Sequence, residues 1–140
     1  MSKIHAMKAA RFALIFHGTD LPMDQISQLL DLQPTRCVRA GELLNRLPEL
    51  RAEDDEWIYA IDLNAPMGED QALNQILQHL IERSCSLHMA ESLGRLTLRL
   101  HIESDYAQMV YTLMPETIHR LMEIGLPLEV TSLSWGEIGI

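Results

Sequence analysis

The sequence is poor in basic residues. Its 11 lysines and arginines stand against 20 aspartates and glutamates, for a formal charge of -9. A phosphate-rich partner needs a basic surface, so we expect neither a nucleic acid nor an anionic membrane as partner.

The only cysteines, Cys37 and Cys85, form no CxxC pair, which is typical of a reducing compartment. No apolar run is long enough for a bilayer, and the N-terminus lacks the apolar core of a signal peptide. These absences predict a cytoplasmic protein.

The composition predicts an ordinary globular domain. Of the 140 residues, 47% are hydrophobic and 22% charged, which excludes disorder and collagen-like repetition. A chain of this length buries about two thirds of its unfolded surface and needs no disulfide or metal for stability. We expect one domain over residues 1–140, with residues 1–9 as a short N-terminal extension.

Hydrophobic periodicity predicts four strands and three helices. Alternation of apolar residues predicts strands at 11–17, 56–63, 95–103 and 126–133, with a further short strand at 107–113. Stripes at helical spacing predict helices at 22–30, 70–84 and 115–124. Residues 32–55 read as irregular, with a short helical turn at 41–46, and residues 64–68 read as a turn.

This order predicts an α+β fold of two layers. The sheet is mixed or antiparallel with four or five strands and three helices on one face, in a ferredoxin-like arrangement with an inserted helix. Residues 11–17 and 95–101 share Arg, Leu and His at matching places, which suggests a tandem β-α-β duplication. The alternative is that any two β-α-β units share this spacing. The second sheet face would be open, and it would carry Ala13, Ile15, His17, Thr97, Arg99, His101 and Glu103.

Several short motifs resemble a known family. Leu-Gln-Pro-Thr stands at 32–35, Arg-Ala-Gly-Glu at 39–42, Trp57 opens a strand, and Leu-Met-Glu-Ile-Gly-Leu-Pro-Leu stands at 121–128. In these features the chain resembles the bacterial domain-of-unknown-function family 4279, roughly from Arg11 to Leu133. The resemblance implies no activity and transfers no catalytic residue.

Two histidines are candidates for acid-base or metal chemistry. His17 and His101 each end a predicted strand on the open face. If the two strands run antiparallel, six residues at about 3.3 Å each place the imidazoles roughly 20 Å apart. One metal ion could not use both, so solvated histidines at strand ends are the favoured interpretation.

The segment Pro34–Glu42 is the candidate binding loop. Arg36, Arg39 and Glu42 bring polar groups into an acidic chain, and an arginine there could clamp a carboxylate or phosphate. The alternative is that Arg39 pairs with a nearby acid. Cys37 between the arginines could be a nucleophile, but a small apolar residue that anchors the loop is favoured.

No other motif carries chemistry. The sequence has no HExxH, no Gly-x-Ser-x-Gly and no glycine-rich turn for a phosphate. The acidic run 53–56 lacks the pattern of a calcium loop and reads as a solvated turn. We therefore expect no catalytic residue, no metal and no cofactor.

Three functional hypotheses follow. The leading one is a non-catalytic module that binds a protein partner, and an immunity-type inhibitor of a basic toxin or nuclease fits the acidic charge. The second is a small-ligand sensor or enzyme, in which Arg39 or Arg99 holds an anion and His17 or His101 supplies acid-base chemistry. The third is a homodimer that pairs edge strands or buries the open face.

Overall fold

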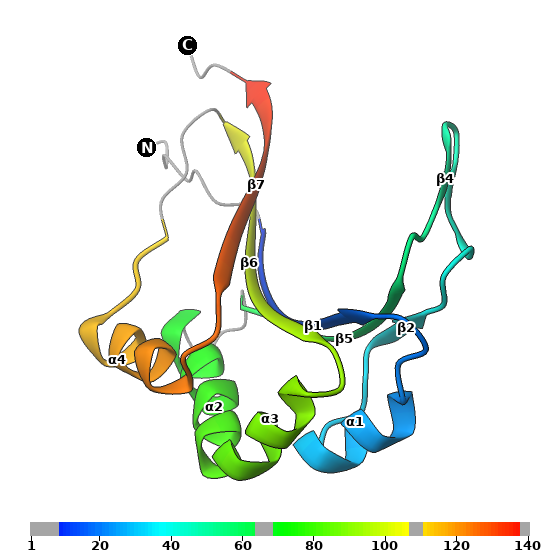
Figure 1. Cartoon of the computed structure of the whole chain (residues 1–140). Coiled ribbons are helices and arrows are strands. Elements are labelled where there is room, and N and C mark those ends of the chain that lie inside the picture. Colours follow the sequence, from blue (N-terminus) through cyan, green and yellow to red (C-terminus); the bar gives the residue numbers. More distant parts are fainter. Residues whose placement is uncertain (1–8, 64–68, 107–110, 138–140) are drawn as a thin grey trace.

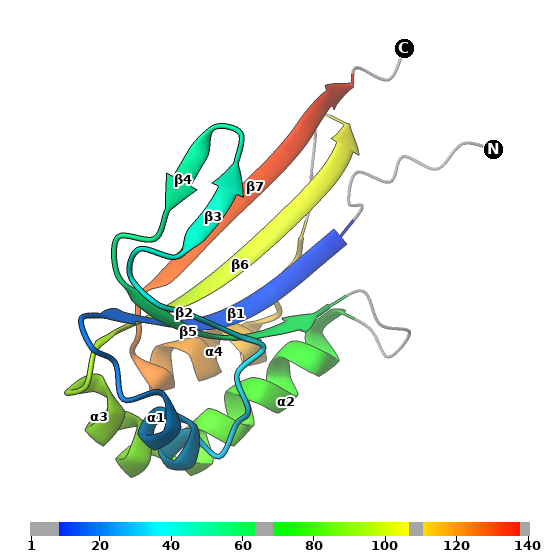
Figure 2. The ribbon, with the colours of Figure 1, turned by 90° about the vertical axis from the view of Figure 1, so that its right-hand side faces the viewer.

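The chain folds into two layers, with a five-stranded sheet above a layer of helices (Figures 1 and 2). The computed structural model describes residues 9–63, 69–106 and 111–137. In these residues the helices are α1 (Met23–Leu30), α2 (Glu69–Glu82), α3 (Ser84–Glu91) and α4 (Pro115–Ile124). The strands are β1 (Ala9–Gly18), β2 (Arg36–Val38), β3 (Leu43–Arg46), β4 (Glu49–Arg51), β5 (Asp55–Asp62), β6 (Arg95–Tyr106) and β7 (Leu128–Glu137).

The main sheet is mixed. Its strand order is β2-β5-β1-β6-β7, and β3 and β4 form a separate two-stranded hairpin. The central strand β1 runs antiparallel to both β5 and β6, and β5 runs antiparallel to β2. Only the β6–β7 pair among these neighbours is parallel. The mixed α+β class predicted from the sequence is therefore confirmed.

Helix α4 shows how local sequence sets an element's ends. Pro115 occupies the first turn, where its missing N–H costs nothing, and Glu116 beside it suits the positive end of the helix dipole. Gly125 ends the helix in the left-handed region at φ 73°, a conformation that glycine adopts without strain. The structure places α4 at the predicted residues 115–124.

The core lies between the sheet and the helices. The inner side chains of β1, β5 and β6 alternate as predicted, and they pack against the apolar stripes of the helices. The largest fully buried side chains are Trp57, Phe12, Phe16, Leu14, Leu21, Ile26, Leu30, Leu63, Leu73, Leu77, Leu80 and Leu98. None of the described helices combines the length and the apolarity that a membrane crossing requires.

The prediction of three helices was wrong, because a fourth follows α2 directly. In α3, only Leu87 and Ala90 are buried, so its apolar stripe is too short for periodicity to reveal. The helical turn predicted at 41–46 was also wrong, since Leu43–Arg46 is a strand that pairs with Glu49–Arg51. Turn residues around Pro48 join the two strands, and the irregular region 32–55 is therefore largely a hairpin and a short edge strand.

The two predicted β-α-β units differ from each other in the structure. In the second half, β6 and β7 are adjacent and parallel, as expected of such a unit. In the first half, the chain leaves α1 for the outer strand β2 and returns through the hairpin as β5, which inserts antiparallel between β2 and β1. The predicted strand 56–63 pairs antiparallel with 11–17, and the two halves do not share one topology.

Some of the predicted segments include residues that the structure does not describe. Residues 1–8 of the predicted extension and the predicted turn 64–68 lie outside the described residues, while Ala9 already belongs to β1. Residues 107–110 of the predicted extra strand also lie outside them. The rest of that segment, 111–113, has no strand structure, because the chain there leads into α4.

Candidate functional site

The side of the main sheet that bears no described helix is the candidate site, and we call it the open face. Figure 1 shows that the sheet curves, with β6–β7 rising on one side and the β3–β4 hairpin on the other, so the open face lies inside the bend. The strand register assigns to it Arg11, Ala13, Ile15, His17, Arg36, Val38, Glu56, Ile58, Ala60, Asp62, Arg95, Thr97, Arg99, His101, Glu103, Glu129, Thr131 and Leu133.

The middle of the open face is not solvated as the sequence predicted. Ala13, Ile15 and Thr97 are all buried. The reason is their place on central strands, where side chains of the neighbouring strands flank each residue: Ile15 lies between Ile58 and Thr97 in the register. The middle of the face is therefore buried, and polar groups surround it.

Three ion pairs join charged or ionisable side chains of the open face across strands. Arg11 Nε donates to Asp62 Oδ1 at 3.2 Å, and Arg99 Nη2 donates to Glu129 Oε1 at 3.0 Å. His17 Nδ1 lies 3.1 Å from Glu56 Oε2. Such pairs stabilise a sheet by only a fraction of a kcal/mol each, about 0.2–1. Their main effect is to balance charge on this face although the chain as a whole is strongly acidic.

The two histidines do not meet. His17 lies opposite Arg95, and His101 lies opposite Arg11 in the same antiparallel pair, so about six residues of strand, roughly 20 Å, separate them. His101 is held locally, with Nδ1 at 2.7 Å from Thr131 Oγ1 and Nε2 at 3.3 Å from Glu103 Oε2. In the described residues no group of three or more histidine, cysteine or acidic side chains is placed to hold a metal ion.

The candidate residue Arg39 has a structural partner, Asp55. Arg39 Nη1 donates to Asp55 Oδ2 at 2.6 Å and to the Leu21 carbonyl at 3.1 Å. The same carboxylate accepts the backbone N–H groups of Leu21 at 3.0 Å and Ala40 at 2.8 Å. Asp55 is only 4% exposed. It thus joins the turn before α1, the loop after β2 and the start of β5.

These contacts set the acidity of Asp55. The hydrogen bond from the Ala40 N–H, with those from Arg39 and Leu21, lowers the pKa of the Asp55 carboxyl below its ordinary value, and burial opposes them. The carboxylate is therefore ionised and satisfied in the folded protein. An open pocket of about 540 Å³ lies beside it, lined by Asp20, Leu21, Arg39, Ala40 and Asp55.

Asp55 was misjudged from the sequence, where the run 53–56 reads as a solvated turn. A signal was present, because Asp55, Trp57, Tyr59 and Ile61 follow one another at period two. That spacing puts Asp55 on the same side of β5 as the buried Trp57. The tryptophan side is the core side, so the carboxylate faces inward.

In the described residues, the remaining loop candidates form no hydrogen bond with the Asp55 carboxylate. Glu42 Oε2 accepts the backbone N–H of Arg39 and so closes the turn at Gly41. Arg36 is exposed on β2 and has no side-chain partner among the described residues.

Cys37 is exposed rather than buried, so its predicted role as an apolar anchor was wrong. Partial burial raises the pKa of its thiol, with Arg39 opposing, which does not favour a nucleophilic thiolate.

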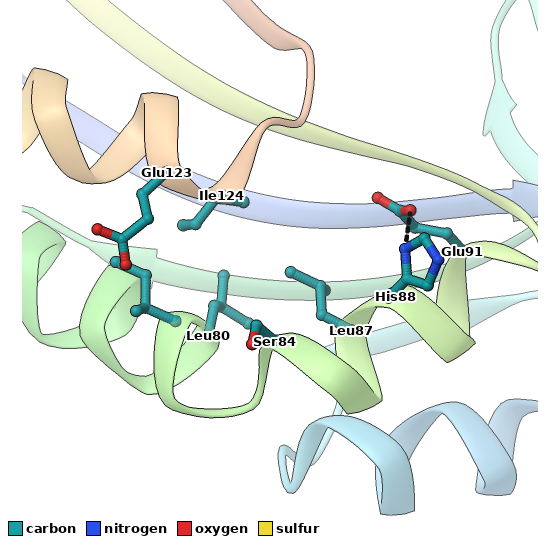
Figure 3. A pocket seen from close by; sticks show the side chains of 8 residues that line it. Leu80, Ser84, Leu87, His88, Glu91, Glu123 and Ile124 are labelled. Atoms are coloured by element: carbon teal, nitrogen blue, oxygen red, sulfur yellow. Dashed lines mark ion pairs between the residues drawn. The ribbon is translucent and has the colours of Figure 1, made fainter.

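A separate pocket lies in the helix layer (Figure 3). It has a volume of about 370 Å³, an apolar base that includes Leu80, Leu87 and Ile124, and polar residues at its rim. His88 on this rim lies 3.5 Å from Glu91 and is largely exposed. Neither this pocket nor the one beside Asp55 includes His17, Arg99 or His101. The six sequence candidates (His17, Arg36, Arg39, Glu42, Arg99 and His101) are therefore not gathered into either pocket.

Comparison with known proteins identifies the family. The model of a domain of unknown function, DUF4279, matches residues 6–135. The chain belongs to the DUF4279 family. The match covers nearly the whole chain and confirms the resemblance seen in the motifs at 32–35, 39–42 and 121–128. No curated protein and no solved structure shows significant similarity to this DUF4279 domain.

Removal of the Arg99 guanidinium from the DUF4279 domain should hardly change its stability. The Arg99–Glu129 pair is partly exposed on both sides, and such pairs contribute about 0–1 kcal/mol. We expect Arg99→Met to lower the free energy of unfolding by less than about 1 kcal/mol, measured by urea unfolding. A much larger loss would show that the pair organises the β6–β7 edge.

Proposed function

We propose that this DUF4279 chain is a non-catalytic binding module that recognises a protein partner with the open face and the β3–β4 hairpin. The observation that carries the proposal is the hairpin itself, which projects away from the helix layer beside the open face (Figures 1 and 2). It presents four exposed leucines, Leu43, Leu44, Leu47 and Leu50, and Leu47 at its tip is 89% exposed. Clustered exposed apolar residues are typical of protein interaction sites.

The hairpin is built to project. Its two strands pair with each other and belong to no other sheet. Its base is closed by hydrogen bonds between Gly41, Glu42 and Ala52, and Arg51 Nη1 donates to the Gly41 carbonyl at 3.0 Å. A two-stranded hairpin alone is only marginally stable in water. A partner that covers the leucines would bury apolar surface that the domain alone exposes to water, and this burial would favour binding.

The charge of the whole chain, rather than that of the open face, supports a basic protein as the partner. The chain carries a formal charge of -9. A negative electrostatic potential raises the association rate with a basic protein, while the contacts at the interface determine the specificity of binding. An immunity-type inhibitor of a basic toxin or nuclease remains the kind of module that fits these features. The small-ligand or enzyme alternative has less support, because His17, Arg39, Arg99 and His101 are each engaged with a neighbouring group.

The strand order of the main sheet also supports a more specific fold assignment. The run β1-α1-β2-β5-α2-β6 has the strand order β2-β5-β1-β6 with antiparallel neighbours. This supports a ferredoxin-like unit to which the hairpin, α3 and α4–β7 are added.

The hairpin leucines give the direct test. We expect Leu47→Glu with Leu50→Glu to weaken partner binding about 30-fold or more, because the loss of a central apolar contact that dominates an interface costs about 2 kcal/mol or more. The partner is first captured from host lysate with the tagged wild-type protein and identified by mass spectrometry. Binding of the purified partner to wild type and variants is then measured by calorimetry.

The matched control is Met89→Glu. Met89 is also exposed, but it lies on α3 in the helix layer, on the other side of the sheet from the open face. Its variant should bind as the wild type does. Equal binding by the hairpin variant and the wild type would contradict the proposal. A small molecule retained in the native mass spectrum, with no stoichiometric protein partner, would instead support the ligand-binding alternative.

A further inference from the structure

Among the described residues, the strand β7 forms an edge of the main sheet with no outer neighbour. It is the last strand in the sheet order and bonds to β6 along one side. Among its ten residues only Glu129 and Glu137 are charged, and none is lysine or proline. Edge strands of this length usually carry such residues, because an unpaired backbone edge accepts a further strand.

The register shows which backbone groups of β7 face outward. The Leu98 N–H donates to the Pro127 carbonyl at 2.9 Å. In a parallel ladder the following odd-numbered residues, Glu129 and Thr131, then turn their backbone groups toward β6. The N–H and C=O of Val130 therefore point away from the sheet. The Val130 side chain lies on the helix side and is 61% exposed.

An apolar flank of α4 borders the same edge. In Figure 1, α4 lies at the β7 end of the helix layer and α1 at the opposite end. Arg120 of α4 faces α2, since its Nη1 donates to Asn74 Oδ1 at 3.0 Å. At about 100° per residue, Ile118 and Met122 lie on the opposite flank of α4. Both are exposed, Met122 by 74%.

We propose that a second copy of this chain docks here. Its β7 pairs antiparallel with this β7 about a two-fold axis perpendicular to the sheet, and the two main sheets become one. That axis keeps both helix layers on the same side, so the Ile118–Met122 flanks of the two α4 helices face each other. A two-fold interface of this kind uses the same patch on both subunits.

Charge selects a second copy over a basic protein. The chain is strongly acidic, yet the described side chains of this patch include one carboxylate, Glu129, which Arg99 already pairs. The patch therefore offers little to a basic partner. Two identical, nearly uncharged patches can meet without bringing unpaired carboxylates together, and the exposed Val130, Ile118 and Met122 are buried in the contact. The hairpin and the open face stay accessible.

Sedimentation equilibrium of the full chain tests this inference. The wild type should have twice the monomer mass of 15.9 kDa, with dissociation on dilution. Val130→Pro removes an outward N–H and leaves the β6–β7 ladder intact, since proline is tolerated at such edge positions. Met122→Glu places a charge on the α4 flank of each copy. Each variant should raise the dimer dissociation constant about tenfold or more.

The controls are Leu47→Glu on the hairpin and Met89→Glu on α3, which introduce the same charge at exposed apolar positions away from β7. Both should dimerise as the wild type does, and circular dichroism confirms that each variant is folded. A wild type that stays monomeric at about 100 µM overturns the inference. Undiminished dimerisation of both Val130→Pro and Met122→Glu would also overturn it.

Discussion

Replacement of Trp57 by alanine is expected to lower the free energy of unfolding by about 3–5 kcal/mol. Trp57 is fully buried on β5, and its ring meets that of Phe16 edge to face, with centroids 5.6 Å apart. Its Nε1 donates to Ser27 Oγ of α1 at 3.0 Å. The variant therefore loses packing between the sheet and α1, a ring contact and a hydrogen bond. The free energy of unfolding of a whole domain is about 5–15 kcal/mol, so this loss is a large part of its stability.

Trp57→Phe separates these contributions. Phenylalanine keeps an aromatic ring against Phe16 but loses the indole N–H, so Ser27 loses its donor. We expect a loss of about 1–2 kcal/mol. Both variants are measured by urea unfolding followed by circular dichroism. If the two losses are equal, ring packing against Phe16 contributes nothing, and the hydrogen bond from Trp57 to Ser27 of α1 accounts for the whole loss.

Asp55→Asn is expected to destabilise the fold strongly and to loosen the loop beside the open face. Asp55 accepts the N–H groups of Leu21 and Ala40 and the Arg39 guanidinium. An amide presents one oxygen, so part of this set is left without an acceptor, and buried donors that lose their partners are costly. Urea unfolding measures the loss. Asp62→Asn is the matched control, because the Asp62 carboxylate is exposed beside Arg11 and its loss should be small.

The same carboxylate predicts a pH dependence. The folded-state pKa of Asp55 lies below its ordinary value of 3.8, so the unfolded chain binds a proton more readily than the folded one. The stabilisation is complete above the ordinary pKa and is lost as the pH falls from there through the folded-state pKa. Unfolding between about pH 5 and pH 2 should therefore be less pH-dependent in Asp55→Asn than in the wild type. An unchanged profile would show that Asp55 is not the titrating group.

The elements with complete local signals were predictable. The β6 pattern of Leu96, Leu98 and Leu100 between polar residues specifies a half-buried strand, and the structure forms it with a C-terminal extension to Tyr106. Helix α4 has its proline, acid and glycine at the expected places. The separation of His17 from His101 followed from strand direction, and the antiparallel β1–β6 register confirms it.

The candidate site was harder, because burial and pairing depend on segments far apart in the sequence. Arg39 and Asp55 are 16 residues apart and meet only because β5 returns beside β2. Cys37 reads as a small apolar residue, yet it stands exposed on the edge strand β2. The leucines of the hairpin resemble core residues in composition, and only the pairing of β3 with β4 shows that no core receives them.

By itself, the sequence determined the mixed α+β class, the family and the residues of the strongest helices and strands, because caps and hydrophobic periods act over a few residues. Tertiary structure decided the rest. It inserted β5 between β2 and β1 and buried Asp55 under Arg39. It also lifted the hairpin away from the body and left β7 at the edge of the sheet. These outcomes depend on contacts between segments that are distant in the sequence. A local sequence pattern does not indicate the entropy that such contacts cost or the packing energy that they gain.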